Sequence, residues 1–372
     1  MGFDFSEAQR DWLFREIYKA YIQARKNKRK TADEFKFEIN YIDNLNGLVE
    51  SILSRDYQPS RSMAFVTFKP VTREIFAAPF RDRVVHHFLF NRNGGWWDRR
   101  FIYDSYSCRK GKGTLMAVER LVKKERQISQ NYKKKTWVYK FDIQAFFMSL
   151  PRRELYSRVL WGLKRQYPKG GFEFEVCRFL WHRIIMDDPT VGARKRGHAE
   201  NWSPKILPPS KSLFNQPPGQ GIVIGNLTSQ LLSNIYLDKL DKFVTQKLGH
   251  KYYGRYVDDF YIFVLEKDRW KMDEDIREIE TFLLGMGLKL HPKKRYIQPI
   301  EKGVQFIGAQ IYPRRVLPSK RVIGNFRSAA QRYMMGMVED DSIISYLGLM
   351  EHRDSHKVIS EIFSEVGWEY KK

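Results

Sequence analysis

Two adjacent aspartates within a run of strand-forming residues constrain the fold of this chain more than any other feature. The stretch RYVDDFYIFV, residues 255–264, places Asp258 and Asp259 between aromatic and β-branched side chains, which favour strands. On a straight strand the two carboxylates would point to opposite faces, and one would enter the apolar side. We therefore expect the chain to reverse here, so that both carboxylates emerge on one side of a hairpin.

Carboxylates this close together require a positive partner. At a separation of about 4 Å, two such charges repel by about 4 kcal/mol at an effective dielectric near 20. They would take up a proton or bind a cation, and a hard divalent ion such as Mg²⁺ is the natural one. Asp142 ends the strand-like run TWVYKFD and could supply a third oxygen ligand in the same sheet. Three acids at adjacent strand ends can hold two metal ions about 4 Å apart, an arrangement used for in-line nucleotidyl transfer.

Two further Asp-Asp pairs occur in surroundings that do not indicate a metal site. Asp187-Asp188 and Asp340-Asp341 lie in loop-like or helical surroundings, and most such pairs are solvated turns. The pair in the hairpin differs because strand-forming residues flank it on both sides and a second strand-end acid, Asp142, lies upstream. These surroundings favour a functional role over a solvated turn.

Charge and hydropathy restrict the partners of the chain. Lys and Arg number 66 against 43 Asp and Glu, which gives a net charge of +23 and indicates a partner rich in phosphate, with nucleic acid as the first candidate. No apolar run approaches the roughly 20 residues of a membrane span. The N-terminal residues lack the layout of a signal peptide. We therefore expect a cytoplasmic protein without a membrane partner.

The pattern of apolar positions predicts a mixed α and β architecture. Residues 5–55 are expected to form a helical layer, with a basic break before a second helix through Phe35, Ile39 and Ile52. The pattern of apolar positions is weaker from residue 164 to residue 218. The part at about 186–216 is rich in Pro, Gly and polar residues. We expect that part to be a loop-rich insertion on the surface.

The hairpin residues Tyr256-Val257-Asp258-Asp259 resemble the Tyr-x-Asp-Asp motif of the reverse transcriptases. The likeness runs in the family's order from about residue 35 to the C-terminus. It implies an α+β, right-hand polymerase with fingers, a palm built on an antiparallel sheet, and a helical thumb. The implied activity is RNA-directed DNA synthesis, with an RNA template, an RNA/DNA duplex and dNTPs as partners. The expected divisions are 1–135 for N-terminal helices and fingers, 136–312 for the palm with its insertion, and 313–372 for the thumb.

The resemblance also implies the metal site. FDIQAFF matches the block that carries the first metal-binding acid, so Asp142 would bind two Mg²⁺ ions together with Asp258 and Asp259. Mn²⁺ could replace Mg²⁺, and the carbonyl of Ile143 would help. LKLHPKK resembles the block whose lysine, here Lys294, approaches the leaving pyrophosphate.

Further residues acquire expected roles in substrate binding. KPVTREI resembles the strand pair that holds the incoming triphosphate, which gives that role to Lys69 and Arg73. Phe147 would lie beneath the sugar and exclude a 2′-hydroxyl. The remaining nucleotide-binding candidates are Ile224, Gly225 and Gln230. CRKGKGT lacks the spacing of a phosphate-binding P-loop. Its basic side chains are expected to contact nucleic-acid backbone, and they are Arg109, Lys110 and Lys112.

One departure from the family pattern indicates which group of reverse transcriptases the chain resembles. Most members have Gln-Gly-x-x-x-Ser-Pro before the palm helix, whereas this chain has IGNLTSQ from Ile224 to Gln230. That version resembles the bacterial enzymes of diversity-generating retroelements and of defence-associated groups. Losing the Gln side chain removes a polar contact near the nascent base pair, and this leads to the hypothesis of relaxed nucleotide selection.

Three biological roles remain open. The insertion and the FFMS variant after Asp142 favour an antiphage defence system, with a dedicated noncoding RNA or a small accessory protein as a further partner. The alternative is the mutagenic reverse transcriptase of a diversity-generating retroelement. A catalytically silent RNA-binding scaffold is the third, and the retention of three mutually repelling acids argues against it.

Overall fold

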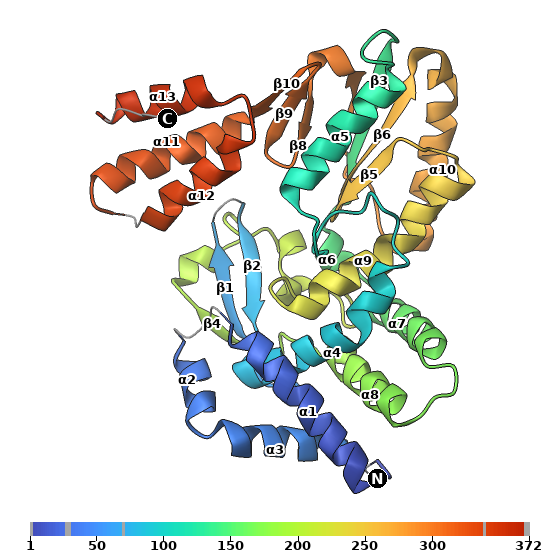
Figure 1. Ribbon diagram of the computed structural model, residues 1–372, viewed down its shortest axis with the longest axis vertical. Helices are drawn as coiled ribbons and strands as arrows, with labels where there is room; N and C mark the ends of the chain where they lie inside the picture. Colours follow the sequence, from blue (N-terminus) through green and yellow to red (C-terminus); the bar gives the residue numbers. More distant parts are fainter. Residues whose placement is uncertain (1–2, 27–30, 69–70, 338–339, 368–372) are drawn as a thin grey trace. The chain divides into compact units, whose positions relative to one another are not determined.

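The structure is a computed structural model that describes residues 3–26, 31–68, 71–337 and 340–367 (Figure 1). The chain divides into two compact units, each assembled from three stretches of sequence. The first unit consists of Met1–Ile102, Ile143–Phe243 and Glu280–Leu290. The second unit consists of Tyr103–Asp142, Val244–Ile279 and His291–Lys372. Within the described ranges, no helix combines the length and the hydropathy needed to cross a bilayer.

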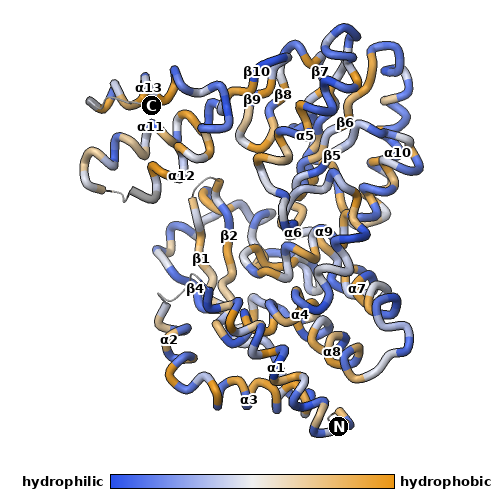
Figure 2. The backbone as a smooth tube through the Cα atoms, viewed as in Figure 1, coloured by the Kyte–Doolittle hydropathy of each residue, from blue (hydrophilic) through white to orange (hydrophobic). Residues whose placement is uncertain are grey.

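The first unit is mainly helical. Its helices are α1 (Glu7–Ala24), α2 (Ala32–Ile39), α3 (Tyr41–Leu53), α4 (Phe80–Asp98), α6 (Phe146–Ser149), α7 (Arg152–Gln166), α8 (Phe172–Met186) and α9 (Leu227–Lys242). α1 packs on α3 and α4, α7 packs on α8, and α4 packs on α9. Hydrophobic and hydrophilic segments alternate along these helices, as expected for helices with one buried face (Figure 2).

The N-terminal helices depart from the expected pattern in two ways. The single helix predicted through residues 35–52 is divided at Asn40 into α2 and α3. The expected apolar stripe is also only partly buried, because Phe35 is 66% exposed and Ile39 is 64% exposed, whereas Ile52 is fully buried. The break at Asn40 explains the difference, since residues on either side of it no longer share one helical face.

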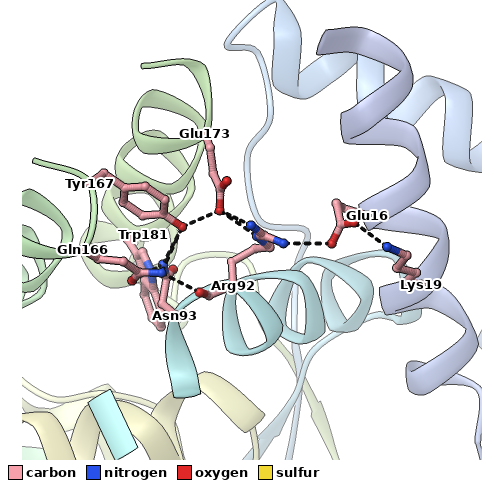
Figure 3. A network of polar contacts seen from close by, with 8 residues as sticks. All are labelled: Glu16, Lys19, Arg92, Asn93, Gln166, Tyr167, Glu173 and Trp181. Atoms are coloured by element: carbon pink, nitrogen blue, oxygen red, sulfur yellow. Dashed lines mark hydrogen bonds and ion pairs between the residues drawn. The ribbon is translucent and has the colours of Figure 1, made fainter. Parts of the chain in front are cut away.

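A polar network joins three helices of the first unit (Figure 3). Arg92 of α4 donates to Glu173 of α8 through Nε at 2.7 Å and to Glu16 of α1 through Nη1 at 3.2 Å. The indole N–H of Trp181 in α8 donates to the side-chain oxygen of Asn93 at 2.8 Å. Because these partly buried polar groups are paired, the three helices can pack closely without leaving a charge unsatisfied.

The first unit also contains a three-stranded sheet in the order β2-β1-β4. Its strands are β1 (Met63–Thr67), β2 (Arg73–Ala77) and β4 (Arg194–Arg196). β1 pairs antiparallel with β2 and parallel with β4. The segment predicted as a loop-rich insertion therefore contributes an edge strand, together with the short 3₁₀ helices η1 (Ala199–Trp202), η2 (Pro209–Lys211) and η3 (Leu213–Asn215).

The second unit is built on a four-stranded antiparallel sheet in the order β5-β6-β3-β7. Its strands are β3 (Thr136–Asp142), β5 (Tyr253–Tyr256), β6 (Asp259–Leu265) and β7 (Tyr296–Pro299). A second antiparallel sheet contains β8 (Val304–Phe306), β9 (Ala309–Tyr312) and β10 (Arg315–Pro318). α5 (Thr114–Ile128) shares a hydrophobic core with both sheets through Leu121, Val138 and Phe306.

Helices complete the second unit. α10 (Met272–Gly285) follows the β5–β6 hairpin, and the division between the units falls within it. The C-terminal helices are α11 (Lys320–Met334), α12 (Asp340–Glu351) and α13 (His356–Glu365). They enclose a core of their own around Phe326, Met350 and Ile362. The helical character expected for the last sixty residues is therefore present.

Candidate active site

The paired aspartates lie at a tight reversal between β5 and β6. Tyr256 pairs with Asp259, so only Val257 and Asp258 form the turn. Val257 has a φ of 56°, a left-handed value that is unusual for a β-branched residue. Such backbone strain persists only where the surrounding structure holds it, and it often occurs at functional sites. The reversal expected from the sequence is thus present, with Asp259 as the first residue of β6.

Asp142 lies opposite Asp259 in the same sheet. It is the last residue of β3, and the register of β3 with β6 pairs the two aspartates directly. Side chains of directly paired residues in antiparallel strands lie on one face of the sheet, within about 5.5 Å at Cβ. The structure therefore brings an acid from residue 142 together with the acids of the hairpin.

The electrostatics of the three acids reflect this proximity. Burial raises the pKa of Asp258 to about 7, and repulsion from Asp142 and Asp259 adds to the effect. Burial also raises the pKa of Asp259, while the nearby Lys140 ammonium opposes the shift. A pKa near 7 means that Asp258 would take up a proton readily at neutral pH, chiefly because burial disfavours the charged form.

Two lysines act as counterions. Lys294 Nζ lies 2.9 and 3.0 Å from the two carboxylate oxygens of Asp142, and Lys140 Nζ lies 3.4 Å from Asp259 Oδ1. The sequence analysis assigned Lys294 to the leaving pyrophosphate rather than to Asp142, and it assigned no role to Lys140. The signal for Lys140 is its place two residues before Asp142 on the same strand, since alternate residues share a face.

The donor set fits a hard divalent cation. Carboxylate oxygens are the ligands that Mg²⁺ prefers, and a bound cation would stabilise the charged form of Asp258, whose pKa is raised by burial and by repulsion from Asp142 and Asp259. In the described part of the chain, no three His, Cys, Asp or Glu side chains lie close enough together to hold one ion. Lysines pair with Asp142 and Asp259 instead. Asp142, Asp258 and Asp259 are the residues that could hold the metal after these pairs open.

Arg255 is a further residue of the site that the sequence analysis did not assign. Its guanidinium is fully buried and donates to the carbonyl of Val257 at 2.8 Å and to the hydroxyl of Ser105 at 3.1 Å. Its backbone N–H also donates to the carbonyl of Asp104 at 2.9 Å. Arg255 thus holds the turn that carries Asp258. An arginine inside an apolar hairpin is the signal that could have identified it, because a buried guanidinium needs several acceptors.

The expected nucleotide-binding residues belong to the first unit. Arg73 is exposed at the start of β2, and Phe147 is half-buried while its neighbour Phe146 is buried. Ile143 forms an isolated antiparallel bridge with Leu290. Lys69 lies outside the described residues.

The loop from Ile224 to Asn226 runs beside β2. The carbonyl of Ile224 accepts a hydrogen bond from the N–H of Phe76 at 3.1 Å. Gly225 has a φ of 128°, and a Cβ at this position would lie 3.0 Å from the Phe76 carbonyl oxygen, so glycine is required. Gln230 is exposed on the first turn of α9.

The three basic candidates in the loop before α5 differ in exposure. Arg109 is half-buried and donates to the carbonyl of Ser105 at 2.9 Å. Lys112 donates to the carbonyl of Tyr103 and lies over the ring of the same residue. Lys110 is exposed. Arg109 and Lys112 therefore stabilise their own loop, which the sequence pattern did not indicate.

A comparison with known protein families agrees with this geometry. The profile of the family described as Reverse transcriptase (RNA-dependent DNA polymerase) matches residues 78–311, more than half of the chain. The matched range contains Asp142, Asp258 and Asp259. It confirms the expected α+β, right-hand polymerase fold and, at the level of the family, the expected enzyme class. No curated protein matches the chain.

Solved structures similar to this chain include yeast telomerases. The telomerase of Candida tropicalis, in complex with a fragment of telomeric RNA, has a TM-score of 0.48 and 12% identity, over 84% of this chain and 56% of that one. The telomerase of Candida albicans, also with a fragment of telomeric RNA, has a TM-score of 0.47 and 9% identity, over 90% of this chain and 60% of that one. The chain thus spans less than two thirds of the length of these telomerases.

Proposed function

The chain belongs to the reverse transcriptase family, and on this premise we propose that it copies RNA into DNA with Asp142, Asp258 and Asp259 as its metal-binding acids. The observation that carries the proposal is the direct pairing of Asp142 with Asp259 beside a turn that holds Asp258. Two acids from paired strands and a third from the adjoining turn would form the oxygen-rich site that nucleotidyl transfer requires.

In the proposed reaction, a primer 3′-hydroxyl, or a protein hydroxyl, attacks the α-phosphate of a dNTP. Two Mg²⁺ ions, or Mn²⁺ in their place, would lower the pKa of the attacking hydroxyl and stabilise the departing pyrophosphate. The three aspartates would hold these ions, with help from the carbonyl of Ile143. Lys294 Nζ, which bonds Asp142 in the structure, would leave that carboxylate and donate a hydrogen bond to the pyrophosphate.

Residues of the first unit would bind the nucleotide. Lys69 and Arg73 would contact the triphosphate, and the exposure of Arg73 supports this role. The half-buried ring of Phe147 would pack beneath the sugar, where a 2′-hydroxyl would clash. The strand-like contact of Ile224 with Phe76 supports a fixed position for the loop that carries Gly225. Gln230 would complete this contact surface.

The proposed subdomains are those of the right-hand polymerase fold. Residues 1–135 would form the N-terminal helices and fingers, 136–312 the palm, and 313–372 the thumb. The template and the RNA/DNA duplex would contact the basic loop before α5. Among its candidates Lys110 has the strongest support, because it is exposed.

We propose that the enzyme acts in the bacterial cytoplasm as part of an antiphage defence system, with a dedicated noncoding RNA or a small accessory protein. The support is the insertion at about 186–216 and the FFMS sequence of α6. A diversity-generating retroelement would instead have a template repeat, a variable repeat and a small basic accessory gene beside the polymerase gene. Finding these elements in the genomic neighbourhood would replace the defence role with the diversifying one.

A primer-extension assay tests the catalytic proposal. Native protein with Mg²⁺, dNTPs and a primed RNA template should extend the primer, and the Asp258→Ala plus Asp259→Ala variant should not. Equal products from both proteins would remove the proposed site. No product from either would favour the silent RNA-binding scaffold. Sequencing the nucleic acid that copurifies with the protein, before and after dNTP addition, would identify the template.

A further inference from the structure

One face of the three-stranded sheet in the first unit carries a row of basic side chains. In the β1–β2 register Thr67 pairs with Arg73, and in the β1–β4 register Met63 pairs with Arg194 and Phe65 with Arg196. Paired residues lie on the same side of a sheet, as do alternate residues of one strand. Arg73, Arg194 and Arg196 therefore share a face, which we call the arginine face.

The opposite face of this sheet is buried against the insertion. The carboxylate of Glu74 accepts hydrogen bonds from the Ser212 hydroxyl and from the Leu213 N–H, both at 2.7 Å. The ring of Phe76 packs on that of Phe214 with centroids 5.6 Å apart. These contacts fix the insertion to the face of the sheet opposite the arginine face. β4 is therefore an ordered edge strand.

Lys195 shows how the two faces differ within β4. Its ammonium lies 4.2 Å from the ring centroid of Phe214 and 5.0 Å from that of Trp202, so it points toward the insertion. All three residues are exposed, and Arg194 and Arg196, on either side of Lys195, belong to the other face. β4 thus provides two arginines for the arginine face. Its lysine, Lys195, lies on the opposite face and can serve as a control.

The arginine face has the chemistry of a surface for an anion. Among the described residues, no acidic side chain lies within ion-pair distance of Arg73, Arg194 or Arg196. Arg194 and Arg196 have Cα atoms about 6.6 Å apart along the strand. Arg196 and Arg73 are two strands and two residues apart, about 12 Å at Cα. The exposed Met63 and the half-buried Phe65 lie between the basic side chains.

We propose that the arginine face binds the backbone of single-stranded nucleic acid. Arg194 and Arg196, with Cα atoms about 6.6 Å apart on one strand, can each contact a different phosphate of the same strand, while Arg73 at the other end of the face stays available for the proposed contact with the dNTP. An aromatic side chain among them provides a surface for a base, as in other proteins that bind single strands. The inference rests on the proposed function for the nature of the partner, but it needs neither dNTP nor metal. The insertion would then enlarge the nucleic-acid surface of the fingers.

The test measures binding of labelled single strands to the full-length protein without dNTPs. Arg194→Ala plus Arg196→Ala should weaken binding of a mixed-sequence RNA roughly tenfold, because two phosphate contacts are lost. The slope of log affinity against log salt should become shallower by about 1.4, since each phosphate contact to a single strand contributes about 0.7. Lys195→Ala, in the same strand but on the opposite face, should bind within about twofold of native protein. DNA of the same sequence separates the two sources of phosphate backbone, and a loss with either supports the proposal.

Two results would overturn the proposal. One is native affinity and native salt dependence in the double-alanine variant. The other is displacement of the RNA by polyglutamate as effective as by unlabelled RNA, which would indicate a surface for acidic protein. Thermal unfolding of each variant checks the fold, and Arg194→Gln plus Arg196→Gln provides a second pair that keeps side-chain length. Asp258→Ala plus Asp259→Ala separates the two proposals, because it should abolish primer extension and retain the contribution of the arginines to RNA binding.

Discussion

Asp142 and Asp259 are direct partners in the register of β3 and β6, and each carboxylate has its own lysine. The arrangement places two acids and two ammonium groups around the turn that carries Asp258. Charge balance is therefore maintained by side chains that a divalent cation would have to displace. Burial, together with repulsion from the other two acids, raises the pKa of the third acid, Asp258, so it takes up a proton more easily than an ordinary aspartate.

Metal binding should consequently depend on pH. Because the pKa of Asp258 is raised to about 7, a cation competes with a proton at this carboxylate below that pH. The apparent affinity for Mg²⁺ should fall by up to about tenfold for each pH unit below 7 and level off above 8. Calorimetric titration of the native protein at pH 6, 7 and 8 measures this dependence. An affinity that stays constant from pH 6 to 8 would contradict the raised pKa.

Glu125 should give the fold a pH dependence that is separate from the metal site. This carboxyl in α5 is buried, both its oxygens lack a hydrogen-bond partner among the described residues, and burial together with repulsion from Glu301 raises its pKa to about 8. Between the ordinary value of 4.5 and about 8, the folded chain binds more protons than the unfolded chain. The free energy of unfolding should therefore fall as pH rises through this window, by up to about 1.4 kcal/mol per unit.

The variant Glu125→Gln tests this dependence, because it cannot ionise. Denaturant unfolding at pH 5, 7 and 9 should show a flatter decline for the variant than for the native protein. At pH 9 the variant should be the more stable of the two. Parallel pH profiles for both proteins would show that Glu125 does not hold its proton in the folded state.

Arg255 should stabilise the fold as well as the turn. Replacing it with Met leaves the Val257 carbonyl and the Ser105 hydroxyl without the guanidinium, and a hydrogen bond to a charged group contributes about 1.5–3 kcal/mol. We expect Arg255→Met to lower the free energy of unfolding by about 3 kcal/mol. Arg277→Met, an exposed arginine of α10, serves as the control and should change it by less than about 0.5 kcal/mol. Urea unfolding of the three proteins compares them, and equal midpoints would contradict the role of Arg255.

Ile224 provides a test of nucleotide selection. Its carbonyl is held by the N–H of Phe76, so a substitution changes the side chain while the backbone contact remains. Ile224→Gln restores the amide that most of the family carries, and it should lower misincorporation because a polar contact near the base pair discriminates between partners. Sequencing the products of both enzymes on one RNA template measures the error rates. Equal rates would reject the hypothesis of relaxed selection.

Local sequence patterns were sufficient to predict that Asp142 lies close to the two aspartates of the hairpin. The hairpin follows from two aspartates that a straight strand cannot accommodate, and the position of Asp142 follows from an apolar run that ends in an acid. Both features depend on residues that are adjacent in the sequence, because such residues determine strand propensity and turn geometry. The pairing of β3 with β6 then places the acids together.

Contacts between distant segments could not be predicted in the same way. β4 has three exposed basic residues and no apolar periodicity, so its pairing with β1 left no signal in the sequence. The burial of Arg255 depends on acceptors at Ser105 and on the turn itself. The exposure of Phe35 depends on a helix break at Asn40 that apolar spacing alone does not reveal. In each case tertiary structure overrides the local pattern.

Primer extension by Asp142→Asn tests the central claim most directly. The substitution keeps the shape of the side chain and removes the charge that pairs with Lys294 and would bind the metal. With a primed RNA template, dNTPs and Mg²⁺, extension should fall at least about a hundredfold, since even residues that only support a metal ligand cost 10–100-fold. Asp188→Asn, from an Asp-Asp pair outside the site, should extend the primer as the native protein does. Native-level extension by Asp142→Asn would contradict the assignment of the active site.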